Sequence, residues 1–404
     1  MSHNPRLLRE ADSLANAGHD VRVITPSFTP ELDRRDRRQL KRRKWRHEKI
    51  DYLPLGVMGK ARSIFIRGRR RGASELYKKF GGRRLAEYSY ASAFPEQRRQ
   101  ASLESADWFI AHAQPALPIA AAAARRWNAR LGFDCEDLLS DHGIGSAEIV
   151  RQIEAIYLRD CDYVSAPSKG IADRLQRDYD IKPPVVLYNV FPLYLAKDML
   201  SPAERPSEVV RLHWFSQTIG PGRGIEEAIE ACGMLGEGVE LHLRGNPSAG
   251  YDAAILALAS QRRVNLKLHP QIDHDDLIKA MDQFDVGLAL ERSEHTNYAL
   301  TVTNKIGSYL LAGLAIAATD TAGQREILEQ IPAAGFLYPS GKPKLLAEGL
   351  RRWIQDRKTL KAAQQAAWDA AQRRFCWDIE ARKWLGMLAS AGGDSIESDR
   401  RRLA

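Results

Sequence analysis

Short apolar segments alternate with amphipathic helical segments through most of this chain, and no other feature constrains its fold as strongly. Trp108–His112 and Val239–Leu243 have the length and apolar content of buried strands, whereas segments 117–127 and 225–235 have apolar residues at helical spacing. A strand, a helix and a further strand in succession are typical of a parallel sheet covered on both faces. The sequence therefore predicts an α/β fold with doubly wound sheets.

The alternation occurs in two series with a polar stretch between them. The chain has 404 residues, which is too long for one comfortable core. Residues 196–208 lose the periodicity and gather serines and prolines. We therefore expect two facing Rossmann-like domains, at 1–195 and 209–375, followed by a helix over 376–392 and a tail over 393–404. Ligands of such sheets bind outside the carboxyl ends of the strands, so we expect the site in the cleft between the domains.

A helix that begins near Thr303 has the features of an anion site. Thr303 or Asn304 can cap its first turn, and Gly313 follows its last apolar residue. The free N–H groups of a first helical turn attract anions, and Lys305 adds a full positive charge there. Phosphate is the ligand that this arrangement favours.

The basic residues are concentrated in one segment. Residues 31–84 hold 20 Lys and Arg against 6 Asp and Glu, a local charge of +14, so the remaining 40 and 45 leave −5 elsewhere. The densest runs are 34–44 and 67–71, with apolar residues at 64–66 between them. An anionic membrane surface would suit residues 34–84. A solvated, partly mobile insertion is the second interpretation, and a nucleic-acid surface is the third and least favoured.

Membrane-spanning and disulfide-stabilised classes do not fit the sequence. No apolar run reaches the length that a membrane span needs, and the N-terminus lacks a stretch of signal-peptide type, so we expect a cytoplasmic protein. The four cysteines are scattered without a CxxC pair, which favours reduced thiols.

Several motifs together carry a family resemblance. They are Asn4–Ala11 with Leu14–Ile24, Ala166–Ala172 with Val186–Val190, the loop Gly220–Gly224, and Arg374–Asp378. In this order they resemble the family 4 (group 1) glycosyltransferases of the GT-B fold, over nearly the whole chain.

The resemblance implies a sugar transfer from a nucleotide-diphosphate donor to an envelope or lipid-linked acceptor, with retention of configuration. The acceptor side would be the N-terminal domain and the donor side the C-terminal domain. The diphosphate would be bound by Arg223, Thr303, Asn304 and Lys305. His112 ends a predicted strand and is our candidate catalytic residue, with a structural histidine as the alternative and His142 as a second choice. The final helix would cross back to the first domain, and the enzyme would act at the inner face of the cytoplasmic membrane.

The resemblance also implies that neither a metal nor another cofactor is needed. Arg223, Lys305 and the helix dipole could neutralise the departing diphosphate. Asp273–Asp275 spells a DxD sequence, which binds metal in a different glycosyltransferase fold, but it opens a helical segment, and N-capping accounts for it.

The chain departs from the family pattern at two places. Ser308 and Leu300 occupy the positions of two usual glutamates, so a catalytically silent binding or regulatory protein is the main alternative function. The family's first strand is also missing, because only four residues precede the first helical segment. Without this strand, backbone groups in the middle of the sheet would lack hydrogen-bond partners, which costs free energy of folding. We therefore expect the true start codon to lie upstream.

Overall fold

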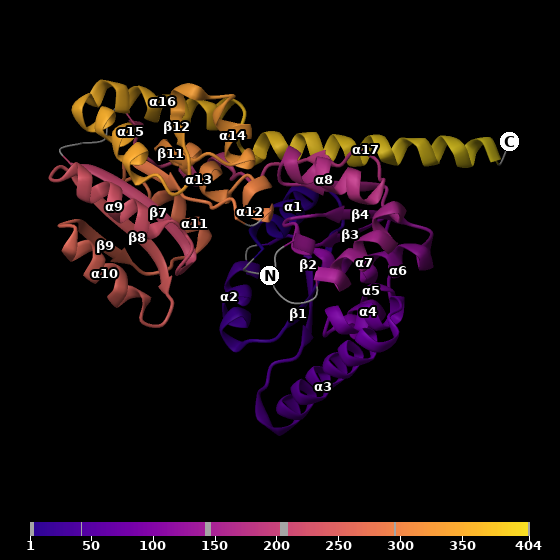
Figure 1. Cartoon of the computed structure of the whole chain (residues 1–404). Coiled ribbons are helices and arrows are strands. Elements are labelled where there is room, and N and C mark those ends of the chain that lie inside the picture. Colours follow the sequence, from indigo (N-terminus) through magenta and orange to yellow (C-terminus); the bar gives the residue numbers. More distant parts are fainter. Residues whose placement is uncertain (1–3, 42, 142–146, 203–208, 295, 403–404) are drawn as a thin grey trace. The chain divides into compact units, whose positions relative to one another are not determined.

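The computed structural model describes residues 4–41, 43–141, 147–202, 209–294 and 296–402, which form two compact units (Figure 1). The first unit contains the described residues of 1–167, 171–187 and 381–404, and the second contains 168–170 with the described part of 188–380. Both have parallel sheets with helices against them, so both are Rossmann-like, as the alternation predicts. No helix in the described ranges has the length and apolar character needed to cross a membrane.

The strands of the first unit form two separate parallel sheets. β1 (Arg22–Ser27) pairs with β2 (Arg46–Asp51). The other sheet has the order β3 (Trp108–His112), β4 (Arg130–Asp134), β5 (Tyr163–Ala166) and β6 (Val185–Val186). Ile24 of β1 and Phe109 of β3 pack on the same apolar cluster, so one layer of helices covers both sheets. Among the described residues no strand pairs with both β1 and β3.

Helices surround these strands. They are α1 (Pro5–Asn16), α2 (Pro30–Leu40), α3 (Gly56–Phe80), α4 (Arg83–Tyr90), α5 (Phe94–Ala101), α6 (Leu117–Trp127), α7 (Ala147–Tyr157) and α8 (Lys169–Tyr179). Asn4 caps α1 by accepting a hydrogen bond of 2.8 Å from the Leu7 amide. Pro5 at the first position has a helical φ, and it lacks the N–H group that would have no partner within the helix there. α1 therefore begins where the sequence predicts it.

The basic segment 31–84 is folded rather than a loose insertion. It contains most of α2, all of β2 and α3, and the start of α4. β2 pairs with β1 along its whole length, so the segment supplies part of a sheet. The described residues of this segment therefore belong to the fold of the first unit. The polar sequence of β2, in which only Ile50 is buried, conceals the strand from pattern analysis.

The second unit has one six-stranded parallel sheet. Its order is β12 (Gly335–Tyr338), β11 (Ala315–Thr319), β10 (Val286–Ala289), β7 (Val210–Ile219), β8 (Val239–Pro247) and β9 (Asn265–His269). Succession along the chain runs outward from β7 in both directions, so the order reverses between β7 and β10. That reversal is a topological switch point, where the loops after the two strands part and leave room for a ligand.

Apolar clusters cover both faces of this sheet. One face packs on α9 (Ile225–Leu235), α10 (Tyr251–Gln261) and α15 (Pro343–Gln355). The other packs on α11 (His274–Lys279), α13 (Asn304–Ala312), α14 (Ala322–Leu328) and α16 (Arg357–Arg373). α12 (Thr296–Leu300) precedes α13. Gly287 of β10 lies against the Tyr309 ring of α13, where any side chain would collide, so α13 sits directly on the sheet.

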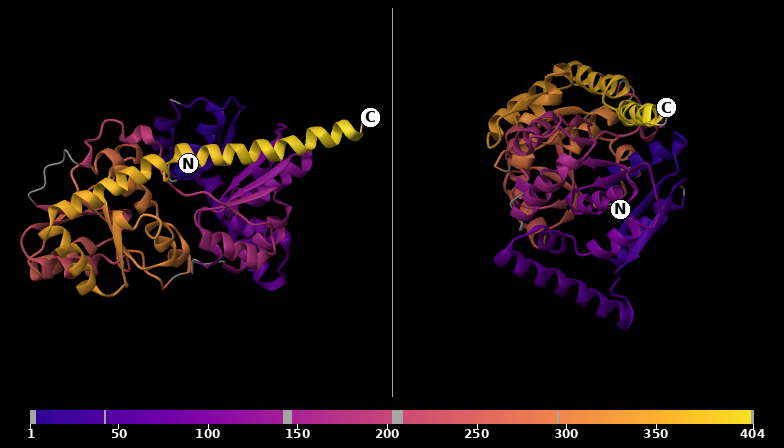
Figure 2. Two further views of the ribbon diagram at one scale, coloured as in Figure 1. Left: turned by 90° about the horizontal axis from the view of Figure 1, so that it is seen from above. Right: turned by 90° about the vertical axis from the view of Figure 1, so that its right-hand side faces the viewer.

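The units divide earlier than the sequence predicts. Val190 and Phe191 lie in the core of the second unit, so the chain has already left the first unit after Leu187. The polar stretch near residue 200 therefore follows the division instead of marking it. α17 (Trp377–Arg402) is a single long helix (Figure 2), and its Trp384 packs with Tyr163 and Leu187 in the first unit.

Candidate functional site

The Gly-rich loop of the second unit leads from the end of β7 to α9 and presents Arg223. Gly222 and Gly224 both have φ of +73°, which other residues rarely adopt. A Cβ on Gly224 would lie 2.8 Å from the Leu290 Cβ, so the loop packs directly on the end of β10. The half-buried Arg223 donates from Nη1 to the Ser216 hydroxyl at 3.3 Å. The structure thus brings Arg223 to the loop edge at the switch point.

Thr303 and Lys305 occupy the first turn of α13, as the sequence predicts. Thr303 is the N-cap and accepts a long hydrogen bond of 3.5 Å from the Lys305 amide. Gly313 ends the helix with φ of +62°, in the left-handed region. Lys305 is only 8% exposed, and its Nζ lies 5.5 Å from the centroid of the Trp214 ring of β7. The cation is therefore fixed between two elements of the switch point.

Glu291 is the partner that the sequence did not assign to Lys305. It lies two residues after the end of β10, and its Oε1 accepts from the Lys305 ammonium and from the Thr303 hydroxyl, the latter at 3.0 Å. Its Oε2 is buried and has no hydrogen-bond partner. The available signal was an acidic residue directly after the apolar segment Val286–Leu290. Lys305 is thus ion-paired in this structure, and an incoming anion must compete with Glu291 for it.

Ser308 is directed to the backbone of its own helix. The Ser308 hydroxyl, which is fully buried, donates to the Asn304 carbonyl at 2.9 Å. Ser308 therefore cannot take over the contacts of the glutamate that the family pattern has at this position. Asn304 is partly exposed at the first position of α13, where its amide is one of the orphan donors of the turn.

The turn after β11 supports the backbone at Glu291 through hydrogen bonds. The Thr319 hydroxyl donates to the Ala289 and Glu291 carbonyls, and the Gln324 amide donates to the Thr319 carbonyl at 2.9 Å. Gly323 lies so close to the Thr301 carbonyl that a Cβ would collide with it. These contacts fix the segments on both sides of the Glu291–Lys305 pair.

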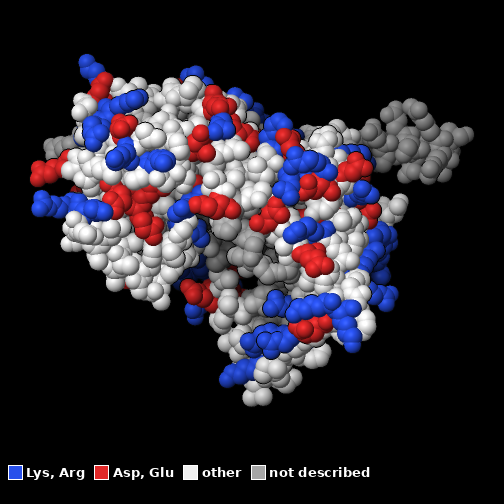
Figure 3. Space-filling model, in the orientation of Figure 1, with Lys and Arg blue, Asp and Glu red and all other residues white. Residues whose placement is uncertain are grey.

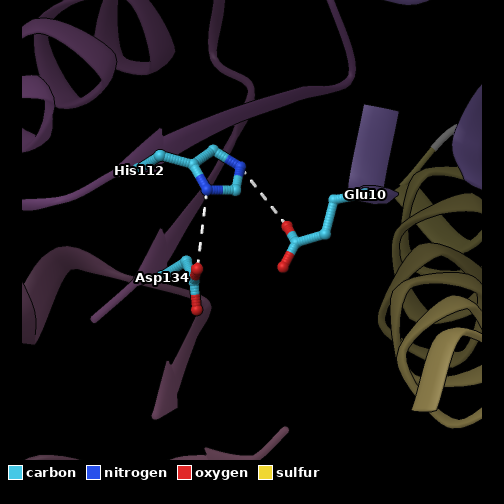
Figure 4. Close-up of side chains that lie close together, drawn as sticks. All are labelled: Glu10, His112 and Asp134. Carbon is cyan, nitrogen blue, oxygen red and sulfur yellow. Dashed lines mark ion pairs between the residues drawn. The ribbon is translucent and has the colours of Figure 1, made fainter. Parts of the chain in front are cut away.

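In the first unit, His112 lies in a buried charged cluster with Arg6, Glu10 and Asp134. The ring lies between two carboxylates (Figure 4): its Nε2 is 3.3 Å from Glu10 Oε2, and its Nδ1 is 3.5 Å from Asp134 Oδ2. Arg6 contacts the same carboxylates, at 3.1 Å to Glu10 and 2.8 Å to Asp134. Glu136, whose side chain is 20% exposed, also has its Oε1 3.4 Å from His112 Nδ1, so two positive side chains face three carboxylates here. Arg6 and Glu10 were missed because an i,i+4 pair on a first helix resembles an ordinary surface pair.

The protonation states in this cluster follow from burial and charge. Burial opposes the charged imidazole, but the carboxylates of Glu10 and Asp134 outweigh it and raise the pKa of His112 to about 10. Burial raises the pKa of Glu10 to about 7. Against the effect of burial, the charge of Arg6 holds the pKa of Asp134 below its usual value. His112 is therefore protonated at neutral pH, and it can donate hydrogen bonds but cannot act as a general base.

The end of β3 carries backbone strain beside this cluster. Ala113 follows His112 with φ of +60°, and its amide donates to the Asp134 carbonyl at 3.2 Å. Non-glycine residues pay to adopt this conformation, and such strain is often found at functional sites.

Metal binding has two candidate places in the described residues. Oxygen and nitrogen atoms of Glu10, His112 and Asp134 lie close enough together to coordinate one ion. The Arg6 guanidinium already contacts both carboxylates, so a metal would add positive charge beside a cation. Asp273 stands at the N-cap position of α11, while the side chain of Asp275 and all of His142 lie outside the described part of the chain.

Two family profiles match this chain, one in each half. Residues 3–189 match the profile described as glycosyl transferase 4-like domain, and residues 205–369 match that of glycosyl transferases group 1. A search of curated proteins found no match.

Solved structures agree on the fold. HepE of Anabaena in complex with UDP has a TM-score of 0.66 at 16% identity, covering 95% of each chain. Sucrose-phosphate synthase of Thermosynechococcus elongatus has a TM-score of 0.65 at 16% identity, covering 96% of this chain and 92% of that one. A glycosyltransferase of Rickettsia africae has a TM-score of 0.65 at 14% identity, covering 96% and 94%. This chain belongs to the family 4 (group 1) glycosyltransferases of the GT-B fold and is a glycosyltransferase.

Proposed function

We propose that this glycosyltransferase takes its sugar from a uridine diphosphate donor whose diphosphate binds at the first turn of α13. The observation that carries the proposal is Lys305, a nearly buried cation fixed at a helix N-terminus and a topological switch point. Arg223 on the neighbouring Gly-rich loop would be the second cation. Related folds were solved with UDP, UDP-glucose and, in a trehalose-6-phosphate protein of Escherichia coli, UDP-2-fluoro glucose, which favours uridine as the base.

The residues present suit stabilisation of a departing diphosphate. In the transfer, the bond between the anomeric carbon and the diphosphate oxygen breaks, and a bond to the acceptor hydroxyl oxygen forms. The acceptor proton passes to the leaving diphosphate, with retention at the anomeric carbon. Lys305, Arg223 and the α13 N-terminus would stabilise the charge that develops on the diphosphate, so we propose a reaction that requires no metal.

We place the acceptor at the inner face of the cytoplasmic membrane. The excess of positive charge within residues 34–84 suits an anionic lipid surface, and a lipid-linked or envelope glycan would be reached there. With a glycan acceptor at that location, we propose a role in polysaccharide biosynthesis. His112 remains our predicted catalytic residue, acting as a proton-bearing donor near the reacting carbon.

Release of free nucleoside diphosphate tests the proposal. The purified chain is incubated with UDP-, GDP- and ADP-sugars, and we expect UDP release that falls strongly in Lys305→Met and persists in Lys344→Met, which changes an exposed lysine of α15. Silence with every donor, together with no UDP binding, would contradict the proposal. UDP binding without turnover would instead support the silent alternative, which the absence of a carboxylate at Ser308 favours. Release from another nucleotide alone would refute uridine.

A further inference from the structure

One helix of the first unit, α3, is open to solvent around most of its circumference. Only Ile66, Ala73 and Tyr77 are buried, and their spacing of seven and four places them along one face, which packs on α4. The right-hand view of Figure 2 shows α3 running along the border of the unit. The remaining faces of a helix of 25 residues are therefore available for contact.

Apolar side chains line the outward side of α3. Four in its first three turns are strongly exposed, namely Val57 at 85%, Met58 at 84%, Ile64 at 64% and Phe65 at 65%, and Leu76 and Phe80 are exposed near its end. Small residues occupy intervening turns on the same side, namely Ala61, Gly68 and Gly72. Single exposed apolar residues need no explanation, but a row along one helix marks an interaction surface.

A basic stripe borders this apolar side. Lys60, Arg67, Arg71 and Lys78 recur at intervals of seven, four and seven residues, so they share a face. In the described residues Lys60, Arg67 and Arg71 form no ion pair, so their charges are not neutralised within the unit. Figure 3 shows Lys and Arg side chains beside uncharged ones where α3 lies in Figure 1.

The helix is held firmly to the rest of the unit. Arg69 makes two hydrogen bonds of 2.8 Å to the Glu96 carboxylate of α5, and Arg62 lies 4.6 Å from the centroid of the Tyr52 ring. A Cβ on Gly59 would lie 2.5 Å from the Leu53 carbonyl, so the first turn packs against the segment after β2. The outward surface is therefore presented in a fixed orientation, and little ordering would be lost on binding.

We propose that α3 is a docking surface for an anionic lipid bilayer and lies in the interface between headgroups and acyl chains. Val57, Ile64 and Phe65 would enter the acyl boundary, and Lys60, Arg67 and Arg71 would contact anionic headgroups. The inference rests on the proposed membrane location and specifies the surface that achieves it. Nucleic acid fits less well, because binding phosphates needs the cations but not the exposed apolar row.

The second arginine-rich helix provides an internal contrast. α2 carries Arg34, Arg37 and Arg38, but none of the exposed large apolar residues belongs to it. The charge of α2 can attract a surface at a distance, but α2 offers no apolar side chains to insert. We therefore assign docking to α3 alone.

Vesicle sedimentation tests this assignment with the full chain. Vesicles of phosphatidylcholine are prepared with and without phosphatidylglycerol, and we expect binding only to the anionic ones. Ile64→Ser with Phe65→Ser should weaken binding by about tenfold or more, because two large apolar side chains no longer leave water. Leu256→Ser, at an exposed leucine of α10 in the second unit, is the matched control and should bind as the wild type does.

Each other outcome overturns the docking surface. Unchanged binding in the Ile64 and Phe65 double variant would mean that α3 does not insert, and equal binding to both vesicle types would mean that charge is irrelevant. Binding of single-stranded oligonucleotide in preference to vesicles would assign the surface to nucleic acid. UDP binding is measured on the same samples to separate the two proposals. Samples that bind UDP but not vesicles would refute the docking surface alone. Samples that bind vesicles but not UDP would refute the donor site alone.

Discussion

The two units each hold a buried group of opposite charges, and the groups differ in how completely they are closed. In the first unit, Arg6, Glu10, His112 and Asp134 neutralise one another, and only His112 retains slight exposure. In the second unit, Glu291 and Lys305 pair at the open end of α13, with side chains 14% and 11% exposed.

The difference indicates different roles for similar residues. A cluster whose charges are paired with one another has little charge left to attract an anion, so loss of Arg6 should act mainly on stability, while His112 keeps the donor role proposed above. A single pair at a helix N-terminus can exchange one partner for an anion, because the positive end of the helix remains when Glu291 is displaced. We therefore expect loss of Arg6 to alter stability and loss of Lys305 to alter binding.

The largest effect is expected from removing Arg6. Arg6→Met leaves Glu10 and Asp134 as buried carboxylates without their guanidinium partner, and this should lower the free energy of unfolding of the first unit by about 3–5 kcal/mol. Urea denaturation followed for the two units separately measures the loss. Arg125→Met breaks an exposed pair with Asp160 and should change it by less than about 1 kcal/mol. Equal effects of the two substitutions would contradict a structural role for the cluster.

Removing Lys305 should weaken UDP binding more than it lowers stability. Lys305→Met removes charge-assisted hydrogen bonds to the diphosphate, worth roughly 1.5–3 kcal/mol, so UDP affinity should fall about 10- to 150-fold. Isothermal titration calorimetry measures the affinity, with Lys344→Met as the control. Wild-type affinity in Lys305→Met would show that α13 does not hold the diphosphate.

The protonation of His112 predicts a pH dependence. Because the folded pKa is raised, its stabilisation is complete below pH 6.5 and is lost as the pH rises to about 10. The difference in unfolding free energy between the wild type and His112→Gln should thus shrink over this range, by at most about 1.4 kcal/mol per pH unit. Glu10, whose pKa is raised to about 7, is present in both proteins and titrates within the same pH range. A pH-independent difference would mean that His112 is neutral in the folded state.

A smaller effect is expected at Glu291. Glu291→Gln removes the charge that competes with an incoming anion while keeping an oxygen for Thr303, so UDP should bind about 3- to 10-fold more tightly, roughly 1 kcal/mol. Inorganic pyrophosphate should gain by a similar factor, since the effect is electrostatic. Weaker binding of both would show that Glu291 supports the site rather than competing within it.

Much of the second unit could be predicted from the sequence because its signals are local. The Thr303 cap, the position of Lys305 and the Gly313 stop all depend on one helix, and the structure has all three. The Glu291–Lys305 pair joins residues 14 apart, and it exists only because β10 ends beside the α13 turn. Contacts of that kind follow from packing, which sequence patterns do not report.

The first unit was harder to predict for the same reason. β2 has the sequence Arg-His-Glu-Lys-Ile-Asp, which shows no apolar alternation, and only its pairing with β1 makes it a strand. Arg6 and Glu10 have the spacing of a solvent-facing pair, although both are buried. The long α3 was hidden by four glycines within a run of basic residues.

Hydrogen exchange with and without UDP tests the donor site most directly. We predict that UDP slows exchange of the amides in the first turn of α13, around Thr303–Ile306, and of the loop Gly220–Gly224, because those N–H groups and loops would contact the diphosphate. Amides of α1 in the first unit serve as the reference. Unchanged exchange at α13 with UDP bound, or protection confined to other elements, would contradict the proposal that this helix holds the donor diphosphate.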